Sequence, residues 1–227
     1  MKTFNTLLFI CLFVSLKNHA QKEKDIINTV IERYFHAIGG KERAKQIHTF
    51  SSESVGKLKD NEIILKKKLM LPNLSTTTME YGGKVVSKNT FNGKKGLITQ
   101  QYEETEFNKA ELKRHKKNRS IFPEFDYLKT AKYIGIEKLE QQNCYVLEIE
   151  NTKVYYSVDS GLKRKGVSIQ EKDGKPFLQQ LYFSKYVEIE GLLFPTRLLL
   201  IAGKNKIEFQ TRSIVINKDV KISDFDL

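Results

Sequence analysis

The chain has 227 residues, a formal net charge of +12 and 40% hydrophobic residues. A chain of this length can bury about 70% of its unfolded surface, so a hydrophobic core is available for one domain or at most two. Only two cysteines are present, Cys11 and Cys144. This excludes the disulfide-rich class of small exported proteins.

Residues 1–20 read as a cleaved signal peptide. Lys2 precedes an apolar stretch from Leu7 to Leu16, and a polar segment ends at Ala20. The stretch is about ten residues long, whereas a membrane-spanning helix needs about 20. We therefore expect export to the periplasm with cleavage before Gln21, and no lipid on Cys11, because Ile10 precedes it instead of a small residue.

The basic charge persists in the mature chain, since loss of Lys2 and Lys17 from 39 basic residues leaves 37 against 27 acidic ones, a net +10. Long-range attraction favours anionic partners, which for an exported protein means lipid head groups and not nucleic acid. Peripheral contact with an anionic membrane surface is therefore left open. The clusters Lys66–Lys68, Lys113–Lys117 and Lys163–Lys165 are interpreted as solvated faces.

The segment from Lys24 to Ile38 has the apolar spacing of a helix. The apolar positions recur at steps of three and four: Ile27, Val30, Ile31, Tyr34, Phe35 and Ile38. Gly39-Gly40 ends this helix, and KERAKQI predicts a short second one.

After these helices the pattern changes to strands separated by turns. Turn signals recur about every ten residues, and the runs between them are rich in Val, Ile, Thr, Tyr and Phe, which predicts hairpin-linked antiparallel strands. The signals are Asp60-Asn61, Pro72-Asn73, Gly82-Gly83, Asn92-Gly93, Asp159-Ser160-Gly161, Asp173-Gly174 and Gly203-Lys204-Asn205. Several strands are apolar on both faces, so we expect the helices to cover one face of the sheet. Cys144 is expected to be a small buried strand residue.

A helical insertion interrupts the strands at about residues 108–131. Asn108 and Glu111 have the spacing of a capping box, and Pro123 can begin a second short helix. Phe122, Phe125 and Leu128 give that second helix an apolar side.

Residues that carry chemistry are sparse. No histidine has a partner at metal-ligand spacing, and the nucleophile elbow, the HExxH motif and the phosphate loop are missing. FNGKKG at residues 91–96 is better interpreted as a hairpin turn. We expect no metal, no cofactor and no enzymatic activity; a hydrolase with an unfamiliar site stays open, with Glu103-Glu104 and Asp224/Asp226 as its acidic pairs.

The order of these features resembles the LolA-like superfamily of periplasmic lipoprotein carriers. The resemblance spans about residues 24–227 and rests on YFHAIGGKERAKQI, KLMLPN, FNGKKGLI, NKAELKRHKK with FPEFDYL, NCYVLEIE, YYSVDSGLKRK and EGLLFPTRL. It implies a mainly β (α+β) fold in one domain, residues 21–227: a strongly curved antiparallel sheet that forms an unclosed half-barrel, with helices over the concave face.

The resemblance also implies an apolar cavity for acyl chains, with the insertion as its lid. Candidate lining residues are Leu69, Leu71, Met79, Tyr81, Leu147, Ile149, Tyr156, Leu181, Phe183, Leu198 and Leu200, with Phe122, Phe125 and Leu128 on the lid. In the lipoprotein carrier a sheet arginine latches the lid, whereas the matching strand here offers Lys66, Lys67 and Lys68.

The hypothesis from the sequence is a monomeric periplasmic carrier of a hydrophobic ligand, either a lipid, an acyl chain or a lipidated protein, with a role in outer-membrane lipoprotein or lipid trafficking. The alternative is an accessory envelope domain that docks on another protein without carrying lipid.

Overall fold

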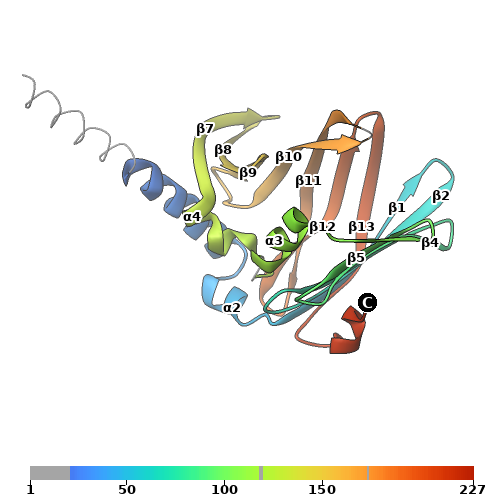
Figure 1. The fold of residues 1–227 in the computed structure, drawn as a ribbon. Coiled ribbons are helices and arrows are strands. Elements are labelled where there is room, and N and C mark those ends of the chain that lie inside the picture. The colour runs from blue at the N-terminus through green and yellow to red at the C-terminus, as the bar shows by residue number, and fades with distance from the viewer. Residues whose placement is uncertain (1–20, 118–119, 173) are drawn as a thin grey trace, which may run out of the picture.

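The protein folds into a single curved antiparallel sheet, with the N-terminal helix and the helices of the 108–131 insertion on its concave side (Figure 1). This computed structural model describes residues 21–117, 120–172 and 174–227. The predicted signal peptide therefore lies outside the described residues. Within the described ranges, no helix has the length and apolar character needed to cross a membrane.

The sheet has 13 strands. In chain order they are β1 (Thr49–Leu58), β2 (Asn61–Met70), β3 (Leu74–Tyr81), β4 (Lys84–Phe91), β5 (Gly96–Gln100), β6 (Glu103–Glu106), β7 (Ala131–Leu139), β8 (Gln142–Ile149), β9 (Thr152–Ser157), β10 (Lys163–Lys172), β11 (Lys175–Ile189), β12 (Leu192–Ala202) and β13 (Asn205–Ile216). The helical segments are residues 21–37, α2 (Lys41–Lys45), α3 (Lys109–Lys117), the 3-10 helix η1 (Pro123–Asp126), α4 (Tyr127–Thr130) and the 3-10 helix η2 (Ile222–Phe225).

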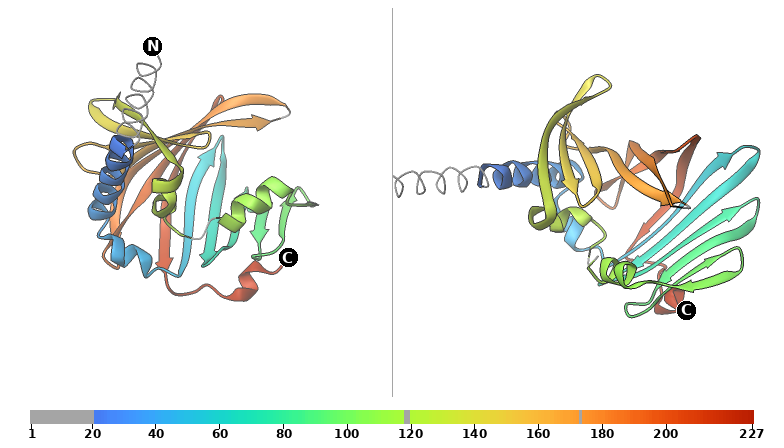
Figure 2. Two further views of the ribbon diagram at one scale, coloured as in Figure 1. Left: turned by 60° about the vertical axis from the view of Figure 1, so that its left-hand side comes forward. Right: turned by 45° about the horizontal axis from the view of Figure 1, so that its top comes forward.

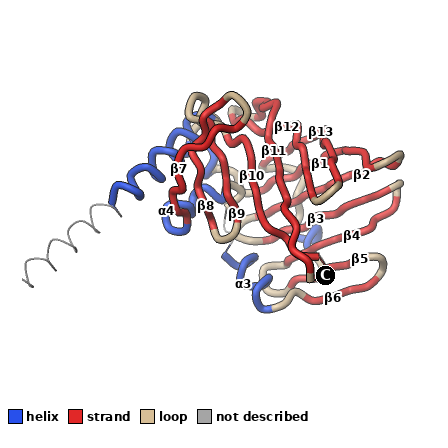
Figure 3. The backbone as a smooth tube through the Cα atoms, turned by 90° about the horizontal axis from the view of Figure 1, so that it is seen from above, coloured by secondary structure: helices blue, strands red, loops and turns tan. Residues whose placement is uncertain are grey.

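The strand order is β6-β5-β4-β3-β2-β1-β13-β12-β11-β10-β9-β8-β7. Nearly every strand pairs with its neighbour in sequence, as hairpin connections require. The exception is the step from β6 to β7, which lie at opposite edges of the sheet (Figure 3). The insertion of α3, η1 and α4 makes this connection, so it must run from one edge of the open half-barrel to the other (Figure 2).

The end of the first helix is fixed on the turn between β11 and β12. Gly39 has a φ of 111°, and a Cβ at this position would lie 2.1 Å from the carbonyl oxygen of Gly191. The amide of Leu193 donates to the carbonyl of Ile38 at 2.8 Å. Only glycine permits both the positive φ and this close approach.

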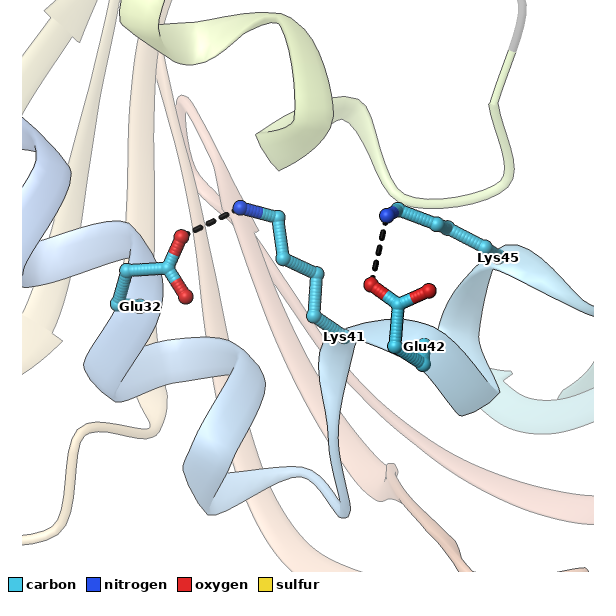
Figure 4. Close-up of polar contacts among 4 residues, drawn as sticks. All are labelled: Glu32, Lys41, Glu42 and Lys45. Carbon is cyan, nitrogen blue, oxygen red and sulfur yellow. Dashed lines mark hydrogen bonds and ion pairs between the residues drawn. The ribbon is translucent and has the colours of Figure 1, made fainter.

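Two ion pairs lie at the start of the chain, one between the first helix and α2 and one within α2 (Figure 4). Lys41 pairs with Glu32, and Lys45 pairs with Glu42 at 2.7 Å. Exposed pairs of this kind contribute little stability because water screens them. The packing of the helix on the sheet therefore matters more than these contacts.

The main core lies between the first helix, the insertion and the concave face of the sheet. Its buried residues are Ile27, Val30, Ile31, Tyr34, Phe35, Ile38, Ala44, Ile47, Phe122, Tyr127, Leu147, Val154, Tyr156, Leu192, Phe194 and Ile216. The expected apolar stripe of the first helix is thus confirmed. A smaller cluster on the outer face holds Cys144, which is fully buried as expected.

The local predictions for turns and caps are confirmed at the positions that the structure describes. The Asn108 amide donates to Glu111 at 2.7 Å, and the Glu111 amide donates to Asn108 at 3.0 Å, which is a capping box at α3. Asn92-Gly93 lies in the β4–β5 hairpin turn. The tight turns at Gln101-Tyr102 and Glu140 were missed, because non-glycine residues there adopt positive φ.

Candidate functional site

The concave face has a covered part and an open part, and β12 crosses both. Alternate residues of a strand share a face, so Leu192, Phe194, Leu198 and Leu200 all point to the concave side. Leu192 and Phe194 are buried in the core under the helices. Leu198 and Leu200 belong to a second cluster in which most side chains are only partly buried.

We call this second cluster the open apolar surface. It comprises Ile63, Ile207, Phe209, Leu58, Leu65, Met79, Tyr81, Leu198 and Leu200. Strand pairing extends it, because Leu181 lies opposite Leu200 and Phe183 lies opposite Leu198, and residues directly opposite share a face. Both are partly exposed. The concave side therefore continues as an apolar surface beyond the part that the helices cover.

An ion pair on the concave face ties the insertion to the sheet. Glu124 of η1 is 1% exposed and pairs with Lys163 of β10, whose side chain is 17% exposed. The hydroxyl of Tyr156 on β9 donates to the same carboxylate oxygen at 2.9 Å. The other oxygen, Oε2, is buried and has no hydrogen-bond partner among the described residues.

Aromatic side chains surround this pair. The Lys163 ammonium lies 5.4 Å from the centre of the Tyr34 ring and 5.6 Å from that of Phe183. Burial, and then the Glu124 carboxylate, raise the pKa of the Tyr34 and Tyr156 hydroxyls well above their ordinary value. Both hydroxyls therefore stay neutral, and that of Tyr156 serves as the hydrogen-bond donor to Glu124.

Lys67 is a second cation on the concave side. It shares its face of β2 with Leu65 and Leu69 and is exposed to solvent. Its pKa is nevertheless lowered, first by desolvation and then by repulsion from Lys163. Exposure and a lowered pKa are compatible here. Solvent reaches the Lys67 side chain, but protein on the inner side of the curved sheet also surrounds it and reduces its solvation. No carboxylate of the described residues pairs with it.

The flanking lysines behave differently. Lys66 pairs with Glu80 at 2.6 Å, and Lys68 pairs with Asp224 of η2 at 2.5 Å. Both point to the outer face, since they alternate with Lys67 along β2. The lysine that holds the insertion is thus Lys163 of β10. The sequence resemblance had pointed to β2, the strand of Lys66, Lys67 and Lys68.

The predicted lining residues fall into three groups. Met79, Tyr81, Leu181, Phe183, Leu198 and Leu200 lie on the open apolar surface or its extension. Leu147, Ile149 and Tyr156 lie in the covered core, and Leu69 and Leu71 line a small hollow beside His115 and Ile121. Contact of any of them with a ligand stays a prediction.

The predicted lid residues also divide. Phe122 is buried, and Phe125 packs on the core with its ring 4.4 Å from that of Phe35. Leu128, however, is 39% exposed, so it does not pack with them. The short 3-10 turn at Pro123 changes the residue period, and this rotates Leu128 away from the other two.

Sequence reasoning missed Glu124 and Lys163 as site residues. Lys163 was grouped with Arg164 and Lys165 as a solvated cluster. A bulge between Lys163 and Lys165 in the pairing with β9 separates them, so that Lys163 faces inward while Lys165 lies over the outer-face ring of Tyr182 at 4.7 Å. A bulge of this kind leaves no reliable signal in one sequence.

A separate hollow of about 670 Å³ lies on the outer face, beside the β10–β11 hairpin. Tyr155, Val167, Ile169 and Leu178 line it together with charged and polar residues. Ile169 is 65% exposed and Leu178 is 49% exposed. The outer face therefore also carries uncovered apolar side chains.

Metal-binding side chains do not gather at the open apolar surface or at the outer hollow, as far as the described residues show. Among the described ranges, no three His, Cys, Asp or Glu side chains are placed to hold a metal ion. Glu103 and Glu104 are exposed on the edge strand β6, and Asp224 is held by Lys68 on the outer face. These acidic pairs thus lie away from the open apolar surface.

Comparison with known proteins identifies the fold of this chain but assigns the chain to no family. No family model matches the chain, and no curated protein matches it in sequence. Among solved structures, a LolA superfamily protein from Nitrosomonas europaea aligns with a TM-score of 0.52 at 10% identity, over 82% of this chain and 95% of that one. A domain described as an outer membrane lipoprotein-sorting protein, from Vibrio parahaemolyticus, aligns with a TM-score of 0.55 at 11% identity, over 91% and 97%.

A DUF1329 family protein from Desulfovibrio piger aligns with a TM-score of 0.56 at 10% identity, over 88% of this chain and 97% of that one. These structures share the curved open sheet across nearly their full length. The protein therefore has a LolA-like fold, as the sequence resemblance predicted. At these identities the similarity establishes the fold alone.

Proposed function

We propose that this protein is an exported carrier of a hydrophobic ligand in the cell envelope. The ligand is a lipid, an acyl chain or a lipidated protein, and the proposed compartment is the periplasm. Support comes from the signal-peptide pattern of residues 1–20 and from the LolA-like fold. Two of the solved structures with this fold are described as a LolA superfamily protein and an outer membrane lipoprotein-sorting domain.

The observation that carries the proposal is the open apolar surface. Leu65, Met79, Leu198 and Leu200 lie together on the concave face and keep part of their area exposed. Each methylene that a ligand buries there contributes about 0.8 kcal/mol, so one acyl chain can offset the entropic cost of its own ordering. The insertion lies along the same side and can enclose such a chain.

The test is ligand displacement from the purified mature protein, with organic extraction of the preparation as a second readout. A fluorescent fatty acid should bind, and unlabelled lipid should displace it. Leu200→Gln should weaken binding several-fold, whereas Leu199→Gln should not, because Leu199 is the next residue of β12 and points to the outer face. Absence of extractable lipid together with absence of fluorescent-ligand binding would contradict the proposal.

The second candidate function is docking on another envelope protein, and the outer hollow favours it. Ile169 of β10 and Leu178 of β11 are exposed there, and exposed apolar patches often mark interaction sites. A photo-crosslinker at position 169 should then trap one protein partner in cells, whereas a crosslinker at Lys88 on β4 should trap none. Recovery of lipid alone would favour the carrier.

A further inference from the structure

The two inward-facing cations lie at the border of the open apolar surface. Lys163 lies against Phe183, and Phe183 is paired with Leu198 of that surface. Lys67 lies two residues from Leu65 on the same face of β2. Leu65 in turn lies opposite Met79 on β3. Each cation is therefore continuous with apolar side chains that remain partly exposed.

The charges around these two lysines do not balance. Glu124 neutralises Lys163, and no acidic side chain among the described residues pairs with Lys67. Lys67 consequently keeps one uncompensated positive charge. The lowered pKa of Lys67 reports the same imbalance, because desolvation and then Lys163 disfavour its charged form. A bound monoanion would neutralise Lys67.

The apolar surface beside Lys67 is long enough for an acyl chain that runs parallel to the strands. From Lys67 to Ile63 the inner face of β2 runs four residues, which is about 13 Å at the rise of an antiparallel strand. Along this length, the inner positions of β2 after Lys67 are Leu65 and Ile63, both apolar. An apolar tail can therefore lie on this surface while a charged head stays at Lys67.

We propose that the concave face binds a long-chain carboxylate, with its head group at Lys67 and its acyl chain on the open apolar surface. This inference rests on the proposed carrier function and narrows its ligand to an anionic single-chain amphiphile. A carboxylate matches the single excess charge and accepts a hydrogen bond from the Lys67 ammonium group. A neutral chain of the same length lacks that interaction.

The experiment compares ligands that share one chain and differ in the head group. Delipidated mature protein is loaded with the neutral probe N-phenyl-1-naphthylamine and titrated with hexadecanoate, hexadecanol or hexadecyl phosphate. Hexadecanoate should displace the probe at a concentration about ten to one hundred times lower than hexadecanol, which is the factor expected for a hydrogen bond to a charged group. This arm needs no variant.

Three variants locate the effect. Lys67→Met should reduce the preference for hexadecanoate over hexadecanol to less than about threefold while hexadecanol still binds. Lys67→Arg should keep the preference. Lys66→Met is the matched control, because Lys66 is adjacent in sequence and points to the outer face, where it pairs with Glu80. Far-UV circular dichroism confirms that each variant is folded.

The outcomes separate this inference from the proposed function. Equal binding of hexadecanol and hexadecanoate by the unmodified protein, or an unchanged preference in Lys67→Met, overturns the inference and leaves the carrier function standing. Tighter binding of hexadecyl phosphate than of hexadecanoate overturns the assignment of a carboxylate. If none of the three chains displaces the probe, the carrier function fails and the inference fails with it.

Discussion

Removal of the Lys163 charge should destabilise the protein through the carboxylate that it leaves behind. In Lys163→Met, Glu124 stays at 0% side-chain exposure and keeps only the hydrogen bond from Tyr156. Breaking a buried ion pair in this way costs about 3–5 kcal/mol of unfolding free energy, because one charge is left uncompensated. The loss should be smaller in Glu124→Gln, since Lys163 is partly exposed and can turn toward water.

The double variant Glu124→Gln/Lys163→Met distinguishes this mechanism from a simple loss of packing. It contains no unpaired charge, and the amide oxygen of the introduced glutamine can still accept a hydrogen bond from Tyr156. We expect it to be about 2 kcal/mol more stable than Lys163→Met alone, which is a coupling between neighbouring sites.

Equilibrium unfolding in urea measures these differences. With an m value of about 2–3 kcal/mol/M, the Lys163→Met change should lower the midpoint by about 1–2.5 M. Equal losses in Lys163→Met and the double variant would refute the reasoning, because the cost would then come from the lysine stem and not from the stranded carboxylate.

Four further predictions follow from single contacts. Asn108→Ala should destabilise α3 by about 1 kcal/mol, seen as faster hydrogen exchange of that helix, because the capping box is lost; unchanged exchange would contradict this. Phe225→Ala should cost about 3–5 kcal/mol in urea unfolding, because this ring is 1% exposed; a loss below about 1 kcal/mol would mean that η2 is not seated. The Cys144 thiol should react with Ellman's reagent only after unfolding, since burial raises its pKa and blocks access; rapid reaction of the native protein would argue against it. Tyr34 and Tyr156 have raised pKa values in the folded state, so the stability that they contribute is complete below the ordinary tyrosine pKa of about 10 and is lost as pH rises above it. Absorbance at 295 nm should show that both tyrosines ionise together with unfolding. Ionisation before unfolding would refute their burial.

Much of the local structure could be predicted from the sequence, because it depends on neighbours along the chain. The stripe from Ile27 to Ile38 follows from the helical period, and the Asn108–Glu111 box follows from the orphan amides of a helix start. Asn92-Gly93 marks its hairpin because glycine accepts a positive φ. The turn at Glu140 has no such mark, and only the structure revealed it.

The arrangement of the site was decided by tertiary structure. Glu124, Lys163 and Lys67 come from η1, β10 and β2, and the curvature of the sheet brings these elements to one concave side. In sequence, Lys67 cannot be told from Lys66 and Lys68, since which of the three faces inward depends on the register of β2. Charge and composition were thus available from the chain alone, but a strand turns alternate side chains to opposite faces, and only the folded sheet shows which lysine meets the apolar surface.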